Sequence, residues 1–61
     1  MEWTSPNSYT KILILNGDEY LIKRSGFGEY TFFTLFINGK ERDVSKDVAE
    51  MRKNVEGGVY E

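Results

Sequence analysis

Two Asn-Gly dipeptides, each at the end of an apolar run, constrain the fold of this chain more than any other feature. The first dipeptide occupies positions 16–17 after the run 9–15, and the second occupies positions 38–39 after the run 30–37. Both runs are rich in aliphatic, β-branched or aromatic residues, which favour β-strands. Asn-Gly supplies the two consecutive positive-φ residues of a type I′ turn, the tightest connection between antiparallel strands. The sequence therefore predicts two β-hairpins.

Each hairpin needs a returning strand, and the sequence supplies one after each turn. These strands are predicted at about residues 19–24 and 40–44, with a glycine-containing loop at 25–28 between the two hairpins. The two hairpins resemble each other around their turns. An old duplication and a purely local similarity of two type I′ hairpins both explain this likeness.

Beyond the second hairpin the spacing of apolar residues changes from two to three or four. Such spacing predicts an amphipathic helix of about ten residues with a single apolar stripe. Ser45 is the predicted N-cap, Asp47 lies in the first turn, and glycines at 57–58 end the helix. The residues of the stripe are Val44, Val48, Met51 and Val55.

The predicted fold class is therefore α+β and β-rich: a small antiparallel meander of about four strands followed by one C-terminal α-helix. Residues 1–8 are expected to form a flexible N-terminal lead-in, residues 9–58 a single β-β-β-β-α domain, and residues 59–61 a C-terminal tail. Trp3 is the one bulky residue in the lead-in. We expect it to fold back onto the domain or onto a partner.

Length and composition restrict what such a domain does. A chain of 61 residues buries a small core and usually needs an additional source of stability, such as a disulfide, a bound metal or a partner. The chain has no cysteine and no histidine, so disulfides, thiolate metal sites and the usual general base near neutral pH are excluded. We expect no enzyme activity, no cofactor and no metal site. Association with a partner is then the remaining source of additional stability.

The charge pattern restricts the kind of partner. Eight basic and ten acidic residues are interspersed and give a formal charge of −2, without the basic cluster that nucleic acid or an anionic membrane requires. No apolar run approaches the roughly 20 residues of a membrane span. The first residues also lack the features of a signal peptide. These observations favour a protein target and a cytoplasmic location, in a bacterium or a host cell.

The two strongest strands lack the alternation of apolar and polar residues that a half-exposed antiparallel sheet shows. In the first strand, Ile12 and Ile14 point to one side while Leu13 and Leu15 point to the other. A helix with one apolar stripe covers only one of these faces. The sequence therefore predicts either closure into a small barrel or contact with another chain, most simply a homodimer through an apolar sheet face.

Candidate binding residues are aromatic side chains outside the expected core, with one charged neighbour. Phe27 is the clearest, because an aromatic residue between two glycines in a loop is poorly placed for burial in its own chain. The acidic residues near the hairpin turns are expected to keep the turns and sheet edges soluble rather than to bind a cation. The candidate partner-binding residues are Trp3, Tyr20, Arg24, Phe27 and Tyr30.

The leading functional hypothesis is a non-enzymatic protein-binding protein that inhibits or regulates a macromolecular target by occlusion. Phages and mobile elements use small proteins of this kind against host defence or to take over host functions. One alternative is a small nucleic-acid-binding module with an SH3-like or OB-like sheet, using Lys11, Lys23 and Arg24. Another alternative is an accessory subunit that folds fully only within a larger assembly.

Overall fold

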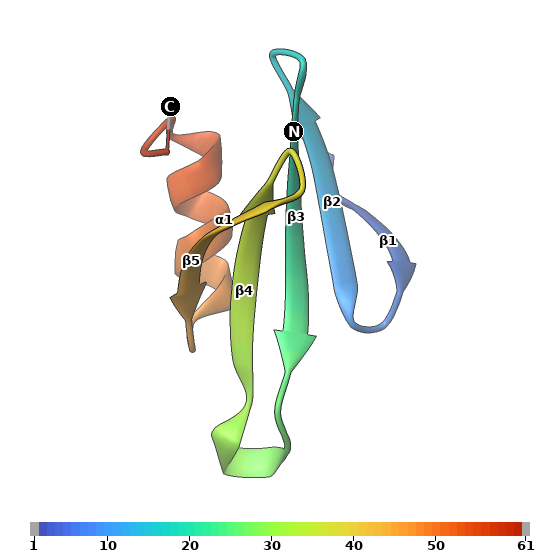
Figure 1. The fold of residues 1–61 in the computed structure, drawn as a ribbon, viewed down its shortest axis with the longest axis vertical. Helices are drawn as coiled ribbons and strands as arrows, with labels where there is room; N and C mark the ends of the chain where they lie inside the picture. Colours follow the sequence, from blue (N-terminus) through green and yellow to red (C-terminus); the bar gives the residue numbers. More distant parts are fainter. Residues whose placement is uncertain (1, 61) are drawn as a thin grey trace.

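The computed structural model describes residues 2–60, which form a five-stranded antiparallel sheet with one helix packed against it (Figure 1). The strands follow one another in the sheet in the order β1-β2-β3-β4-β5, so the sheet is a meander with β1 and β5 at its edges. This arrangement confirms the predicted α+β class, although with five strands rather than about four. The elements are β1 (Thr4–Asn7), β2 (Thr10–Leu15), β3 (Asp18–Ser25), a 3₁₀ turn η1 (Gly28–Tyr30), β4 (Phe32–Ile37), β5 (Lys40–Ser45) and α1 (Val48–Glu56).

The additional strand, β1, lies in the segment expected to be a lead-in. It pairs antiparallel with β2 through Thr4 opposite Ile12 and Asn7 opposite Thr10, with an irregularity between these pairs. Pro6 falls within this strand, and proline is tolerated there because an edge strand has one side free of ladder hydrogen bonds. The local sequence contains a proline and small polar residues, so only the pairing with β2 makes it a strand.

Both Asn-Gly turns have the predicted conformation. The φ angles are 53° at Asn16 and 84° at Gly17, and 51° at Asn38 and 83° at Gly39. Two consecutive residues with positive φ define a type I′ turn, whose twist matches that of the strands that it joins. The first turn sets the register of the whole β2–β3 hairpin. The second sets the register of β4–β5 as far as Phe36 opposite Glu41, beyond which the register shifts and Leu35 lies opposite Asp43.

The helix α1 confirms the predicted C-terminal helix but begins later than the sequence indicated. Asp47, rather than Ser45, is the N-cap, and its Oδ1 accepts a hydrogen bond of 3.0 Å from the backbone N–H of Glu50. Ser45 ends β5, two residues before the N-cap. Its Oγ accepts a 3.1 Å hydrogen bond from the backbone N–H of Asp47 and so helps to position the capping residue. Val44 belongs to β5 and is 51% exposed, so it lies outside the helical stripe.

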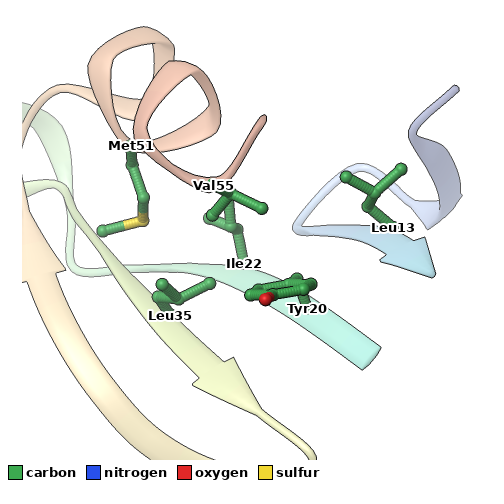
Figure 2. Packing of buried hydrophobic residues seen from close by; sticks show 6 residues of the cluster. All are labelled: Leu13, Tyr20, Ile22, Leu35, Met51 and Val55. Carbon is green, nitrogen blue, oxygen red and sulfur yellow. The ribbon is translucent and has the colours of Figure 1, made fainter. Parts of the chain in front are cut away.

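The core lies between α1 and one face of the sheet (Figure 2). Met51 and Val55 of the helix are each 1% exposed and pack with residues of the central strands, including Ile22 at 1% and Leu35 at 0%. Ile22 and Leu35 are directly opposite each other across β3 and β4. The full set of buried hydrophobic residues is Leu13, Tyr20, Ile22, Leu35, Met51 and Val55.

The opposite face of the sheet also carries apolar side chains, as the sequence predicted. Because neighbouring residues in a strand point to opposite faces, the residues between the core positions of β2, β3 and β4 lie on this second face. We call it the open face, since α1 lies on the other side of the sheet. Ile14 is 62% exposed, Val44 51% and Phe32 37%. The apolar residues of the open face are Ile12, Ile14, Leu21, Phe32, Phe36 and Val44.

Both ends of the described chain are attached to the covered side of the sheet. The Trp3 indole Nε1 donates a 2.8 Å hydrogen bond to Glu56 Oε2 at the end of α1. The Tyr60 hydroxyl donates a 2.7 Å hydrogen bond to Asp43 Oδ2 on β5. Both rings also pack against the core. The two aromatic residues therefore hold the ends of the chain around the helix, and Trp3 folds back onto its own domain. Within residues 2–60, no helix has the length and apolar character needed to cross a membrane.

Replacement of Met51 by Ala should lower the free energy of unfolding by about 2–5 kcal/mol, because it removes a fully buried side chain and leaves a cavity. Met51→Leu conserves the volume and should cost less than about 1.5 kcal/mol. Lys53→Ala on the exposed side of the same helix should change stability by about 0.5 kcal/mol at most. Urea denaturation measures all three, and equal losses for M51A and K53A would contradict the described core.

Burial, with the hydrogen bond to Asp43, raises the pKa of the Tyr60 hydroxyl above its ordinary value of about 10. A proton held more tightly in the folded state stabilises the fold at lower pH. The stabilisation is complete below the unfolded pKa and disappears as pH rises through the folded pKa. The stability of the native chain should therefore fall above about pH 10. Tyr60→Phe should be less stable by about 0.5–1.5 kcal/mol at neutral pH and should lose this part of the alkaline decline. Thermal unfolding at several pH values measures both, and parallel alkaline curves for the two proteins would refute the assignment.

Candidate protein-binding site

The loop between β3 and β4 is closed by hydrogen bonds within its own segment. The Tyr30 N–H donates to the Phe27 carbonyl oxygen at 2.9 Å, and the Thr31 hydroxyl donates to the Gly28 carbonyl oxygen at 2.8 Å. Gly26 has φ of +87°, and a Cβ at this position would lie 2.1 Å from the Tyr30 carbonyl oxygen. Only glycine allows the two ends of the loop to approach so closely. The loop is thus closed by glycine and by backbone hydrogen bonds.

This closed loop carries the two most exposed aromatic side chains among the described residues. Phe27 is 89% exposed and Tyr30 is 79% exposed. The sequence placed residue 30 at the start of a strand, whereas the structure places it in η1 and starts β4 at Phe32. The 3₁₀ turn therefore moves Tyr30 off the sheet and onto the tip of the molecule, close to Phe27 in the chain.

Tyr9 and Arg24 line one hollow together with Phe27 of the loop. The β1–β2 turn and the end of β3 lie at the same end of the sheet as this loop (Figure 1). The Arg24 N–H donates to the Tyr9 carbonyl oxygen at 2.8 Å, and the guanidinium carbon lies 4.9 Å from the centroid of the Tyr9 ring. This distance is within the range of a cation–π contact. Tyr9 remains 56% exposed, so the pair presents an aromatic ring and a positive charge together.

Two shallow hollows meet at the Tyr9–Arg24 pair. One, of about 200 Å³, has an apolar floor of Ile22, Phe33 and Val48 between the sheet and the start of α1. The other, of about 340 Å³, lies between the pair and the loop and is lined by Phe27 and its neighbouring glycines. Neither hollow is lined by an acidic residue. We call the surface formed by Tyr9, Arg24, Phe27 and Tyr30 the loop-end surface.

The structure brings together three of the five predicted binding residues. Arg24, Phe27 and Tyr30 belong to the loop-end surface, whereas the other two lie elsewhere. Tyr20 is 2% exposed and forms part of the core, which corrects the expectation that it lies outside the core. Its ring points to the covered face because β3 alternates and Ile22 occupies the same face. Trp3 packs at the helix end and is bound to Glu56.

Tyr9 is the residue that the sequence reasoning did not select. The signal was present in the register of the first hairpin, because a two-residue turn determines the pairs that follow it as long as no bulge interrupts the ladder, and none interrupts β2–β3. The pairs run from Leu15 with Asp18 to Thr10 with Lys23, so the next pair is Tyr9 with Arg24. Extending the register by one residue was sufficient to place this ring beside the arginine.

The acidic residues near the turns serve local hydrogen bonds. Asp18 Oδ1 accepts a 3.0 Å hydrogen bond from Asn38 Nδ2, and the Oδ1 of the same asparagine accepts from the Glu19 N–H at 3.0 Å. These bonds link the two Asn-Gly turns to each other. Within residues 2–60 no group of three or more Asp, Glu, His or Cys side chains is placed to hold a metal ion.

Comparisons with protein families, with curated proteins and with solved structures find no match to this chain. The geometry of the loop-end surface and of the open face is therefore the basis for the functional argument.

The closed loop predicts a specific response to an added methyl group. Gly26→Ala should destabilise the chain more than Gly17→Ala, because both positions have positive φ but a Cβ at Gly17 meets nothing within 4 Å. We expect about 1–2 kcal/mol for Gly17→Ala from the backbone conformation alone, and a larger loss for Gly26→Ala from the added clash. Urea denaturation gives the energies. Amide chemical shifts should change around residues 26–31 only in Gly26→Ala, and equal effects of the two variants would contradict the closed loop.

Proposed function

We propose that this chain is a non-enzymatic protein-binding domain that occludes a macromolecular target through the loop-end surface. The observation that carries the proposal is the exposure of Phe27 and Tyr30, at 89% and 79%, on a loop closed by glycine and hydrogen bonds. Exposed apolar side chains that lie together mark interaction sites, and tyrosine and arginine are enriched among the hot spots of binding.

The order of the loop strengthens this proposal. A flexible loop loses conformational entropy when it binds, whereas a loop already held in one conformation loses little. The contacts of Gly26 and Thr31 with the loop backbone provide that order. The loop-end surface is therefore preorganised, with two aromatic anchors displayed on a fixed backbone.

The charges of this surface indicate the chemistry of the complementary site. Arg24 lies on the Tyr9 ring between the two hollows, and no acidic residue lines either hollow. A carboxylate of a partner would bind the planar guanidinium of Arg24, and apolar groups of the partner beside that carboxylate would enter the hollows. We infer that the target presents an apolar groove for Phe27 and Tyr30, with an acidic group placed for Arg24.

The class of protein that fits this description is a small inhibitor or regulator, of the type that phages and mobile elements use in the cytoplasm of a host cell. The composition supports a binding role, since the chain has neither histidine nor cysteine to activate a nucleophile or hold a metal. Blocking a target needs only a stable surface of the right shape. A domain of this size provides one.

The arrangement of the basic residues argues against the alternative of a nucleic-acid-binding module. Lys23 pairs with Thr10 and Thr34 on the open face, whereas Lys11 and Arg24 lie on the side of the helix. Lysine and arginine at successive positions of a strand point to opposite faces. The three cations therefore do not form the single basic surface that a phosphate backbone requires.

The proposal predicts that Phe27→Ala and Tyr30→Ala each weaken binding to the target at least about tenfold without lowering stability, because both side chains are exposed. The test is affinity capture from host lysate with the native chain and both variants, followed by titration of the captured protein in purified form. Val59→Ala is the matched control, since Val59 is 63% exposed near the C-terminus, at the end of the molecule away from the loop (Figure 1).

Three results are informative. A protein retained by the native chain and Val59→Ala but lost by both loop variants supports the proposal. Retention that is independent of Phe27 and Tyr30 contradicts it. Capture of nucleic acid with an affinity that falls steeply with salt would replace it by the nucleic-acid alternative.

A further inference from the structure

The open face is the apolar sheet surface on the side away from α1, and its side chains are arranged in rows across the strands. Ile12, Leu21 and Phe36 are directly opposite one another on β2, β3 and β4 and form the middle row. Ile14 lies on one side of this row, and Phe32 and Val44 lie on the other. The row at Leu21 therefore runs through the middle of an apolar surface.

Two opposite charges flank this row on the central strand. Glu19 and Lys23 are each two residues from Leu21 on β3, so all three side chains point to the open face. Glu19 pairs with Ile14, and Lys23 pairs with Thr10 and Thr34. Both charged side chains are exposed. The open face thus carries a negative charge on one side of Leu21 and a positive charge at the equivalent position on the other.

We propose that the open face binds a second copy of this chain, stacked about a two-fold axis that passes near Leu21, in the plane of the interface and perpendicular to the strands. Such an axis reverses the strand direction and leaves each strand above its own copy. It places the row of Ile12, Leu21 and Phe36 against the same row of the second copy. It also places Glu19 over the partner's Lys23, and Lys23 over the partner's Glu19.

The charges select this axis over the other two-fold arrangement. An axis parallel to the strands would place Glu19 on the partner's Glu19 and Lys23 on the partner's Lys23, and like charges facing each other across an interface are unfavourable. Packed sheets lie about 10 Å apart, a distance that a lysine and a glutamate side chain span together. The proposed axis also places Glu41, which ends the middle row on the edge strand β5, opposite its own copy. Both carboxylates are exposed at the rim, where solvent and salt screen their repulsion, so this pair weighs less than the charges on the central strand.

The area of the open face fits a reversible dimer. Strands β2 to β5 have six to eight residues each. With about 4.8 Å between strands and about 3.3 Å per residue, they cover roughly 19 by 20 Å, or about 400 Å² of each copy in projection. The two copies together bury about 800 Å², which is less than the roughly 1,200–2,000 Å² of standard interfaces and is typical of weak, transient contacts. We therefore expect a weak dimer whose population depends on concentration.

This arrangement has a consequence for the loop-end surfaces. Because the axis reverses the strands, the two β3–β4 loops project from opposite ends of the dimer. The dimer therefore carries two separate binding ends, so that a target with two sites is bound more tightly than by one end alone. The dimer itself does not depend on the proposed function, since the open face and the loop-end surface share no residue.

Sedimentation velocity over a hundredfold dilution series tests the dimer itself. The native chain should shift from dimer to monomer as it is diluted. Leu21→Asp should raise the dissociation constant by about 100-fold or more, because it buries unpaired carboxylates on the axis. Ile14→Asp provides a second disruption at a residue that is 62% exposed, where folding is not at risk. Circular dichroism confirms that each variant is folded.

Exchange of the two charges tests the axis. Lys23→Glu and Glu19→Lys should each raise the dissociation constant roughly tenfold, because each places like charges opposite one another twice. The double variant E19K/K23E should return it to within about threefold of the native value. Lys53→Glu makes the same change in net charge as Lys23→Glu at an exposed site on α1, on the other side of the sheet. It should change the dissociation constant by about threefold at most.

The outcomes separate the steps of the proposal. A chain that stays monomeric at the highest concentration overturns the dimer. A dimer that withstands Leu21→Asp and Ile14→Asp uses another surface and overturns the proposed face. If these variants dissociate the dimer but neither single charge exchange changes its dissociation constant, the proposed axis is wrong. None of these results bears on target binding by Phe27 and Tyr30, which the loop variants test separately.

Discussion

The structure depends on one packing contact, between a single apolar stripe of α1 and one face of the sheet. Met51 and Val55 close over Ile22 and Leu35, and these four side chains are almost completely excluded from water. The burial of apolar surface is the main source of stability in a domain this small. Because residues 2–60 form only one α-helix, they provide only one such contact. Every other feature is arranged around the face that the helix covers.

That asymmetry explains where the remaining interactions lie. Trp3 and Tyr60 bring the two ends of the described chain to the covered side, where they pack against the core and bond to Glu56 and Asp43. The opposite face carries apolar side chains that are exposed or half-buried, and the loop-end surface lies at one end of the sheet. The core, the open face and the loop-end surface are thus separate, and we propose the second for self-association and the third for target binding. A change at Phe27 is therefore expected to leave the core intact.

Sequence reasoning succeeded where the determinants are local. The Asn-Gly turns require nothing beyond two residues with positive φ, and the helix follows from the spacing of Val48, Met51 and Val55. It failed where a contact between distant segments decides. β1 is a strand only because β2 offers it an edge, and Tyr20 is buried only because its face of β3 is the one that the helix covers. Of the candidate site, the loop aromatics were predictable from their glycines, whereas Tyr9 required the register.

The two hairpins, the helix and the apolar side chains on both faces of the sheet could be read from the amino-acid sequence alone. They follow from backbone preferences and from the two-residue and 3.6-residue periods of strands and helices. Which face α1 covers depends on the packing of the folded chain, because both faces of β2 and β4 are apolar and periodicity does not distinguish them. That choice leaves Leu21 between Glu19 and Lys23 on the open side, and places Tyr20 in the core.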